Sequence, residues 1–226
     1  MPDQPLRLTV LLSGSGSTFA AIHEWSKHQN SGFVIANVVS DVANAYGLER
    51  AAKAGCDTHC VEFDSFDQRS DFNQALLKAV QATSPDLVVL AGFMRIVDPF
   101  FVRAFDGKLL NIHPSLLPKY PGLNTYKRAL AAFEKAHGST VHFVNDVLDG
   151  GPLIAQAVVA IEHQDTAKTL SQRVQEAERT LYPTVIEWFA HGRLEQRDGL
   201  VWLDGTIRNK PVRGTVNPHT EEFERD

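Results

Sequence analysis

Apolar and helical segments alternate along the first half of the chain. Runs rich in Val, Ile and Leu predict strands at Leu8–Leu12, Phe33–Ser40, Thr58–Phe63 and Asp86–Leu90. The periodicity between them predicts helices from about Thr18, over Tyr46–Ala54 and over Asp67–Ala82. Continuous apolar strands separated by helices are typical of a parallel sheet covered on both sides. The pattern therefore predicts an α/β fold with an open, mostly parallel twisted sheet and helices on both faces.

The second half has a different order of predicted elements. A strand at Lys108–His113 leads into a proline-rich loop, Pro114–Gly122, and a helix is predicted over Thr125–Ala136. Strands are predicted at Ser139–Val144 and Leu153–Ile161, and an apolar stripe predicts a long helix over Thr166–Ala190. We expect Pro183 to kink or divide this helix, because proline lacks the N–H that the helix interior needs.

These segments predict a single domain over residues 1–205, with halves at about 8–108 and 109–205. A polar C-terminal extension follows over residues 206–226, and we expect its last dozen residues to form a mobile tail.

Composition and charge restrict the class of protein. The apolar fraction of 43% and the charged fraction of 22% are those of an ordinary globular protein. A net charge of −5 argues against a general nucleic-acid binder. The longest apolar run, Leu87–Met94, falls far short of the roughly 20 residues of a membrane helix. The N-terminus lacks the form of a secretory signal, and Cys56 and Cys60 match no redox or zinc spacing, so we expect a cytoplasmic protein.

A glycine-rich loop, Ser13–Thr18, lies between the first predicted strand and the first predicted helix. Glycines let a ligand approach the backbone, and a helix start presents free N–H groups, so the loop suits a phosphate. The dinucleotide-binding fingerprint needs a third glycine where Phe19 stands. The alternative is a tight turn with Ser17 or Thr18 as the helix cap, and the spacing leaves both interpretations open.

Asn111 and His113 end a strand, and their side chains point the same way because strand side chains alternate. An amide can donate to a carbonyl oxygen as it becomes an oxyanion, and an imidazole can move protons near neutral pH. The pair therefore suits acyl transfer. The alternative is a buried histidine satisfied by a backbone carbonyl, and the sequence does not decide between the two.

Asp149 lies in the segment Leu148–Pro152, whose Asp-Gly-Gly sequence is first of all a turn signal. A carboxylate beside an imidazole would favour the charged imidazolium. The sequence pattern alone does not bring Asp149 to His113.

The segments Asn111–Pro118 and Leu148–Pro152 together resemble the folate-dependent formyltransferases. The resemblance runs from Val10 to about Leu203. It includes Ser13-Gly14-x-Gly16-Ser17, Ala91–Ile96, Lys119–Gly122 and Val141–Phe143. It implies a Rossmann-like formyltransferase domain that transfers the formyl group of 10-formyltetrahydrofolate to the amine of glycinamide ribonucleotide in purine synthesis. This reaction requires no metal. We also expect no nucleic-acid partner and no membrane, as charge and apolar runs indicate, and a monomer or homodimer.

The resemblance assigns roles to particular residues. Asn111 would orient the formyl oxygen, His113 would be the general acid/base, and Asp149 would hold His113 and an ordered water. The binding residues that it implies are Gly16, Ser17 and Thr18 for the phosphate; Met94, Arg95, Ile96, Val97 and Asn111 for the folate; Arg69 near the folate tail; and Glu178 for the ribonucleotide.

Several alternatives remain open beside these roles. Met94 and Ile96 would pass as core residues, and Glu178 as a solvated edge carboxylate. His142 faces away from Val141 and Phe143, so it could reach the site or be structural.

Thr18, Asn124 and Tyr126 depart from residues that are common in the family, which puts the corresponding substrate contacts in doubt.

Three other functions compete with formyl transfer to glycinamide ribonucleotide. A methionyl-tRNA formyltransferase is expected to carry an RNA-binding extension with a basic surface, and a formyltetrahydrofolate hydrolase a regulatory domain ahead of the first strand. A non-catalytic folate- or nucleotide-binding protein has no need of Asn111, His113 and Asp149 together.

Overall fold

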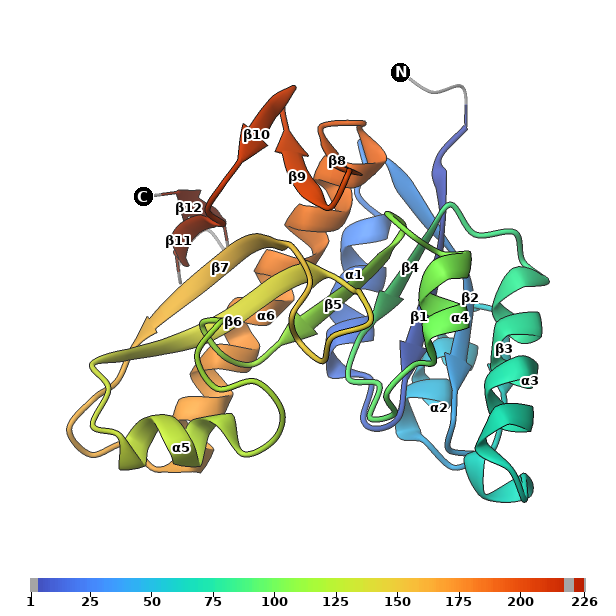
Figure 1. The fold of residues 1–226 in the computed structure, drawn as a ribbon, viewed down its shortest axis with the longest axis horizontal. Coiled ribbons are helices and arrows are strands. Elements are labelled where there is room, and N and C mark those ends of the chain that lie inside the picture. The colour runs from blue at the N-terminus through green and yellow to red at the C-terminus, as the bar shows by residue number, and fades with distance from the viewer. Residues whose placement is uncertain (1–3, 218–221, 226) are drawn as a thin grey trace. The chain divides into compact units, whose positions relative to one another are not determined.

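The computed structural model describes residues 4–217 and 222–225 of the chain (Figure 1). The chain divides into two compact units, residues 1–110 and residues 111–226. The division falls inside the strand that carries Asn111 and His113.

Unit 1 is built on four parallel strands. They are β1 (Leu6–Leu12), β2 (Phe33–Ser40), β3 (Thr58–Cys60) and β4 (Leu87–Leu90), in the order β4-β1-β2-β3. The predicted parallel arrangement is confirmed, and the apolar residues of β1 and β4 are buried as their composition predicts. The third strand ends earlier than predicted, because Phe63 begins a short 3₁₀ turn, η1 (Phe63–Ser65).

The helices of unit 1 lie on both faces of its sheet. They are α1 (Ser17–Ser26), α2 (Tyr46–Lys53), α3 (Arg69–Gln81) and α4 (Pro99–Ala104), with α1 and α2 on one face and α3 and α4 on the other (Figure 1). The sequence pattern missed α4, which has only six residues. Its signal was Asp98 before Pro99, since the Asp98 carboxylate caps the helix by accepting the Phe100 N–H at 3.0 Å.

Unit 2 contains a mixed sheet and a small antiparallel one. The mixed sheet has the order β12-β11-β7-β6-β5, made of β5 (Leu109–His113), β6 (Ala136–Phe143), β7 (Leu153–Ala160), β11 (Val212–Val216) and β12 (Phe223–Arg225). β6 runs antiparallel to β7, and β11 runs parallel to β7. The second sheet, β10-β9-β8, joins β8 (Leu194–Arg197), β9 (Leu200–Leu203) and β10 (Thr206–Arg208). With unit 1, these strands confirm the predicted α/β class and its mostly parallel sheet.

The C-terminal extension contains β10, which pairs with β9, and the strands β11 and β12. β11 continues the sheet beyond β7, and β12 pairs with β11. The expected mobile tail is therefore wrong for residues 215–217 and 222–225, since strand pairing satisfies their backbone groups. Gly214 permits this pairing, because an added Cβ would lie 2.0 Å from the Glu224 carbonyl oxygen. The remaining residues of the expected tail lie outside the described residues.

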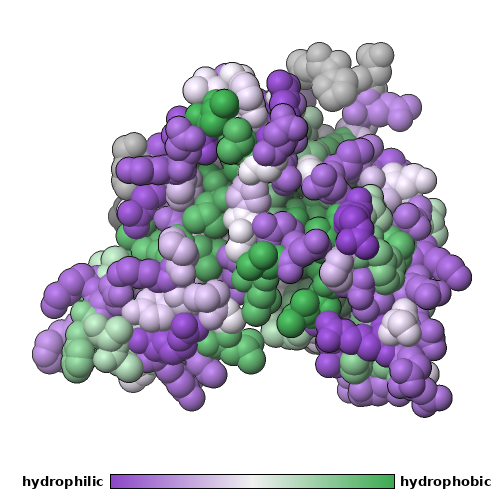
Figure 2. All heavy atoms as spheres, in the orientation of Figure 1, coloured by the Kyte–Doolittle hydropathy of each residue, from purple (hydrophilic) through white to green (hydrophobic). Residues whose placement is uncertain are grey.

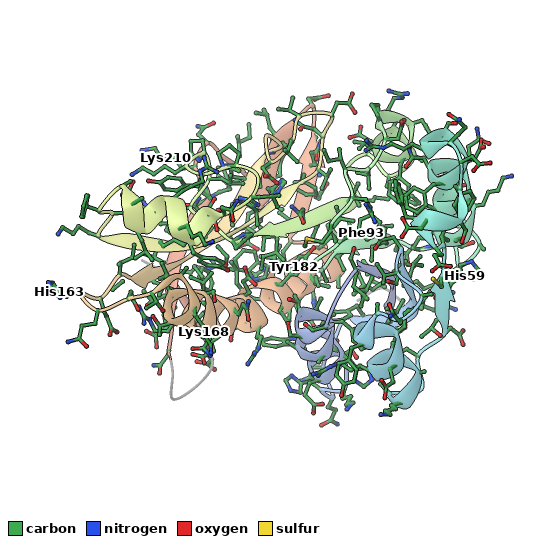
Figure 3. The ribbon with its side chains drawn as sticks, turned by 90° about the horizontal axis from the view of Figure 1, so that it is seen from below. His59, Phe93, His163, Lys168, Tyr182 and Lys210 are labelled. Carbon is green, nitrogen blue, oxygen red and sulfur yellow. The ribbon has the colours of Figure 1, made fainter. Side chains whose placement is uncertain are left out.

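Two helices complete unit 2, α5 (Thr125–Ala131) and α6 (Ala167–Ala190). α5 is shorter than predicted, because Phe133 is left-handed at φ 53° and β6 begins at Ala136. α6 runs through Pro183 without being divided. Its predicted apolar stripe is buried, and Tyr182 lies in the interior (Figure 3). Among the described residues, no helix combines the length and apolar character that crossing a membrane requires.

Candidate active site

His113 ends β5 and is 6% exposed. Its Nε2 lies 2.9 Å from the carbonyl oxygen of Tyr120. A carbonyl only accepts, so we infer that Nε2 carries a proton and that the lone pair of the neutral ring is on Nδ1. Nδ1 lies 3.4 Å from Oδ2 of Asp149. Nε2 therefore has a backbone carbonyl partner, as expected for a histidine with a structural role. Nδ1 instead faces a carboxylate.

Asp149 reaches His113 from the turn between β6 and β7. Its backbone is left-handed, at φ 51°, and its side chain is 6% exposed. The turn needs its glycines, because a Cβ at Gly151 would lie 1.8 Å from the Phe143 carbonyl oxygen. Asp149 Oδ2 also accepts the N–H of Gly122 at 2.8 Å. The carboxylate thus contacts both His113 and the loop that follows it.

Asn111 lies two residues before His113 and is half-buried. Its amide nitrogen is 3.2 Å from Nε2 of His142, whose Nδ1 is 2.8 Å from the Phe143 carbonyl oxygen. Nδ1 of His142 must donate to that carbonyl, so Nε2 accepts from the Asn111 amide. Burial lowers the pKa of His142, which agrees with a neutral ring. The Asn111 amide is thereby oriented, with one N–H and its carbonyl oxygen free of this contact.

Asn111, His113 and Asp149 form a polar cluster in unit 2. An oriented N–H, an imidazole lone pair and a carboxylate can together polarise a carbonyl and move a proton. The sequence predicted Asn111, His113 and Asp149 but left His142 open. The carbonyl of Tyr120 and the N–H of Gly122 were missed, because a backbone group leaves no signal in the sequence.

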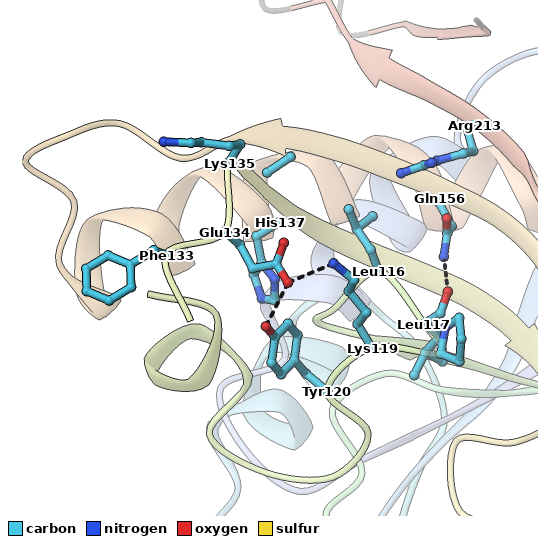
Figure 4. A pocket seen from close by; sticks show the side chains of 12 residues that line it. Leu116, Leu117, Lys119, Tyr120, Phe133, Glu134, Lys135, His137, Gln156 and Arg213 are labelled. Carbon is cyan, nitrogen blue, oxygen red and sulfur yellow. Dashed lines mark hydrogen bonds and ion pairs between the residues drawn. The ribbon is translucent and has the colours of Figure 1, made fainter. Parts of the chain in front are cut away.

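The loop after His113 is held by two buried side chains that the sequence did not single out. Thr140 accepts the Leu117 N–H at 3.1 Å and donates to the Ser115 carbonyl at 2.6 Å. Gln156 donates to the Leu117 carbonyl at 2.7 Å. This loop forms one side of a cavity of about 480 Å³, in which Glu134 accepts hydrogen bonds from Lys119 and Tyr120 (Figure 4).

The glycine-rich loop of unit 1 starts α1 without a side-chain cap. Gly16 occupies the cap position at φ 68°, so the alternative in which Ser17 or Thr18 caps the helix is wrong. A Cβ at Gly16 would lie 2.5 Å from Cα of Gly47, so the approach of α2 requires this glycine. Gly14, in contrast, has open space where a side chain would stand. The start of α1 is therefore available to an anion.

The segment after β4 exposes apolar side chains in unit 1. Met94 is 68% and Ile96 is 57% exposed, so the core interpretation of these two residues is wrong. Both side chains are therefore apolar groups at the protein surface. Figure 2 shows that hydrophobic residues on one face are surrounded by hydrophilic ones. Arg69 donates to the Ile96 carbonyl at 2.8 Å, and Val97 is half-buried. The structure thus brings Arg69 to the predicted folate segment.

Glu178 on α6 is 8% exposed, so the interpretation as a solvated edge carboxylate is wrong. Burial raises its pKa to about 8, with a smaller opposing effect from Arg179. Burial also raises the pKa of Tyr126, and the charge of Glu178 adds to this. The centre of the Tyr126 ring lies 5.4 Å from the centre of the His137 ring.

Among the described residues, the buried side-chain atoms without a hydrogen-bond partner include Thr125 Oγ1, His137 Nε2 and Ser139 Oγ. No group of three or more His, Cys, Asp or Glu side chains in the part of the chain that the structure describes could hold a metal ion.

Known proteins resemble the chain over most of its length. Residues 6–186 match the family described as formyl transferase. The phosphoribosylglycinamide formyltransferase of Escherichia coli K12 is 47% identical over 200 residues, which cover 88% of this chain and 94% of that protein. The trifunctional purine biosynthetic protein adenosine-3 of Bos taurus is 39% identical over 199 residues, or 87% of this chain and 20% of that protein.

Solved structures agree with the sequence matches. The phosphoribosylglycinamide formyltransferase of Coxiella burnetii has a TM-score of 0.86 and 47% identity, covering 90% of this chain and 96% of that one.

Proposed function

This chain belongs to the formyl transferase family, and we propose that it transfers the formyl group of 10-formyltetrahydrofolate to the amine of 5'-phosphoribosylglycinamide in purine biosynthesis. The substrate class rests on the names of the relatives. The observation that carries the chemistry is the distance of 3.4 Å between Nδ1 of His113 and Oδ2 of Asp149. The oriented amide of Asn111 lies on the same strand as His113, two positions earlier.

The side chains of unit 2 suit the transfer step. The amine nitrogen forms a bond to the formyl carbon, the bond from that carbon to the folate nitrogen breaks, and a proton passes from the amine to the departing nitrogen. The free N–H of Asn111 would donate to the formyl oxygen as it gains negative charge, an effect worth about 3 kcal/mol. Nδ1 of His113 would take and return the proton, and Asp149 would stabilise the charged ring.

The binding roles are assigned to groups of matching chemistry. Gly16, Ser17 and Thr18 would hold the phosphate at the uncapped start of α1, through backbone N–H groups. Met94, Arg95, Ile96 and Val97 would contact the folate, with Arg69 near its acidic tail. Glu178 would contact the ribonucleotide as a hydrogen-bond donor, because its raised pKa keeps it protonated at neutral pH.

An absorbance assay of folate deformylation, run with and without the ribonucleotide, tests this function. We expect turnover only when both substrates are present. Equal rates in the two arms would indicate hydrolysis and would overturn the proposed transfer.

A further inference from the structure

Asp41 is a buried carboxylate of unit 1 that the proposed chemistry does not use. It directly follows β2, and its side chain is 0% exposed. Its oxygens have separate partners. Oδ1 accepts from the Ser13 hydroxyl at 2.5 Å, and Oδ2 accepts from Nε of Arg95 at 2.8 Å. A carboxylate at such depth is stable only when it is paired and hydrogen-bonded, and both conditions are met.

The first partner, Ser13, begins the glycine-rich loop. Its hydroxyl proton is used by Asp41, so the oxygen is free to accept the Met94 N–H, at 2.8 Å. Its own N–H donates to the Gly92 carbonyl at 3.1 Å. Ser13 therefore fixes the start of the 92–97 segment, and Asp41 fixes the direction of the Ser13 hydroxyl.

The second partner, Arg95, lies within the 92–97 segment. Its guanidinium carbon lies 3.9 Å from the centre of the Phe63 ring, so the aromatic face and the carboxylate together hold the side chain. The Asp41 carboxylate thus contacts Ser13, the first residue of the glycine-rich loop, and Arg95, a residue of the 92–97 segment.

We propose that Asp41 is a positioning residue that holds the glycine-rich loop and the 92–97 segment in one fixed arrangement, so that both ligands find their binding segments already ordered. This inference rests on the proposed function, which assigns the phosphate to the loop and the folate to the segment. Ordering a segment before binding removes an entropy cost from the binding step. Removal of Asp41 should therefore weaken the binding of both ligands, although it touches neither in this proposal.

The test compares Asp41→Ala and the milder Asp41→Asn with the wild type, using Asp57→Asn as a matched control at an exposed carboxylate. Asp41→Ala removes the acceptor of two hydrogen bonds, one of them to a charged arginine, so we expect KM to rise about 10-fold for both substrates, with kcat within about twofold. Asp41→Asn should show a smaller rise, and Asp57→Asn none. A merely structural role would lower kcat through the folded fraction and leave both KM values unchanged.

Three outcomes would overturn the proposal: unchanged KM values in a folded variant, a rise in only one KM, or equal effects of Asp41→Asn and Asp57→Asn. If Asp41→Ala fails to fold, Asp41→Asn alone decides. Calorimetric titration with the ribonucleotide and with 5-formyltetrahydrofolate measures binding without turnover. Failure of formyl transfer with intact, Asp41-dependent binding would therefore contradict the proposed function and not this inference.

Discussion

The two units present their functional groups in different ways. In unit 1 the phosphate is assigned to backbone N–H groups at the uncapped start of α1, and the folate to an exposed segment after β4. In unit 2 the groups proposed for the chemistry are side chains that are buried or half-buried and have defined partners, as His113 has Tyr120 and Asp149.

The difference separates binding from chemistry. Backbone N–H groups keep their charge and direction when a side chain is exchanged, so a binding site made of them tolerates substitution except where, as at Gly16, a side chain would displace the backbone. A reacting imidazole depends on the tautomer and orientation that its neighbours impose. Substitutions in unit 2 should therefore have much larger effects on turnover than substitutions in the loop of unit 1.

The largest effect is expected for His113→Ala. General acid/base catalysis is worth about 10²–10⁴ in rate, so kcat should fall by that factor while both substrates still bind. Steady-state kinetics with calorimetric binding measures both, and the exposed His163→Ala is the control. Parallel loss of binding and fold would instead support a structural role for His113.

A smaller effect is expected from Glu178, in the dependence of stability on pH. Its pKa is about 8 in the folded state and 4.5 ordinarily, so between these values the folded state holds a proton that the unfolded state has lost. Stability should therefore fall as pH rises through this window. The shift corresponds to at most about 5 kcal/mol.

Urea unfolding of wild type and Glu178→Gln at several pH values between 5 and 8 checks this. The variant should lose less stability over the range. An identical pH dependence in the two proteins would mean that Glu178 is ionised when buried.

His142→Ala should lower kcat about 10-fold, because the Asn111 amide loses the acceptor that orients it. His142→Gln offers a carbonyl oxygen in place of Nε2 and should recover part of the rate. If both variants match the wild type, Asn111 is positioned by something other than His142.

The smallest effect is expected in unit 1. Thr18→Ala keeps the backbone N–H, so the KM for the ribonucleotide should change less than about threefold. A change of 10-fold or more would show that the threonine side chain, and not the backbone, carries the phosphate contact, and would remove the contrast between the units.

The sequence predicted the fold where one local signal was sufficient. Buried strands β1, β2 and β4 follow from apolar runs, and α6 follows from its stripe. The strands from β8 to β12 were missed, since they are short and, in β8 and β10, polar. β11 is recognisable only once β7 offers an unpaired edge.

The site shows the same limit. Asn111 and His113 share a strand, so their alternation placed them on one side. Asp149 lies 36 positions beyond His113, and only the family resemblance connected the two. The partners His142 and Tyr120 depend on the register of β6 and on the path of a loop, which no local pattern encodes.

The central claim is that unit 2 holds His113 with its proton on Nε2 and its reactive lone pair on Nδ1, toward Asp149. Nitrogen-15 NMR of the histidine side chains distinguishes the two neutral tautomers, and the His113 signal is assigned by its absence in His113→Gln. The account predicts the Nε2–H tautomer at a pH where the ring is neutral. A proton on Nδ1 would contradict it, because Nε2 could then not donate to the Tyr120 carbonyl and would be the reactive nitrogen instead.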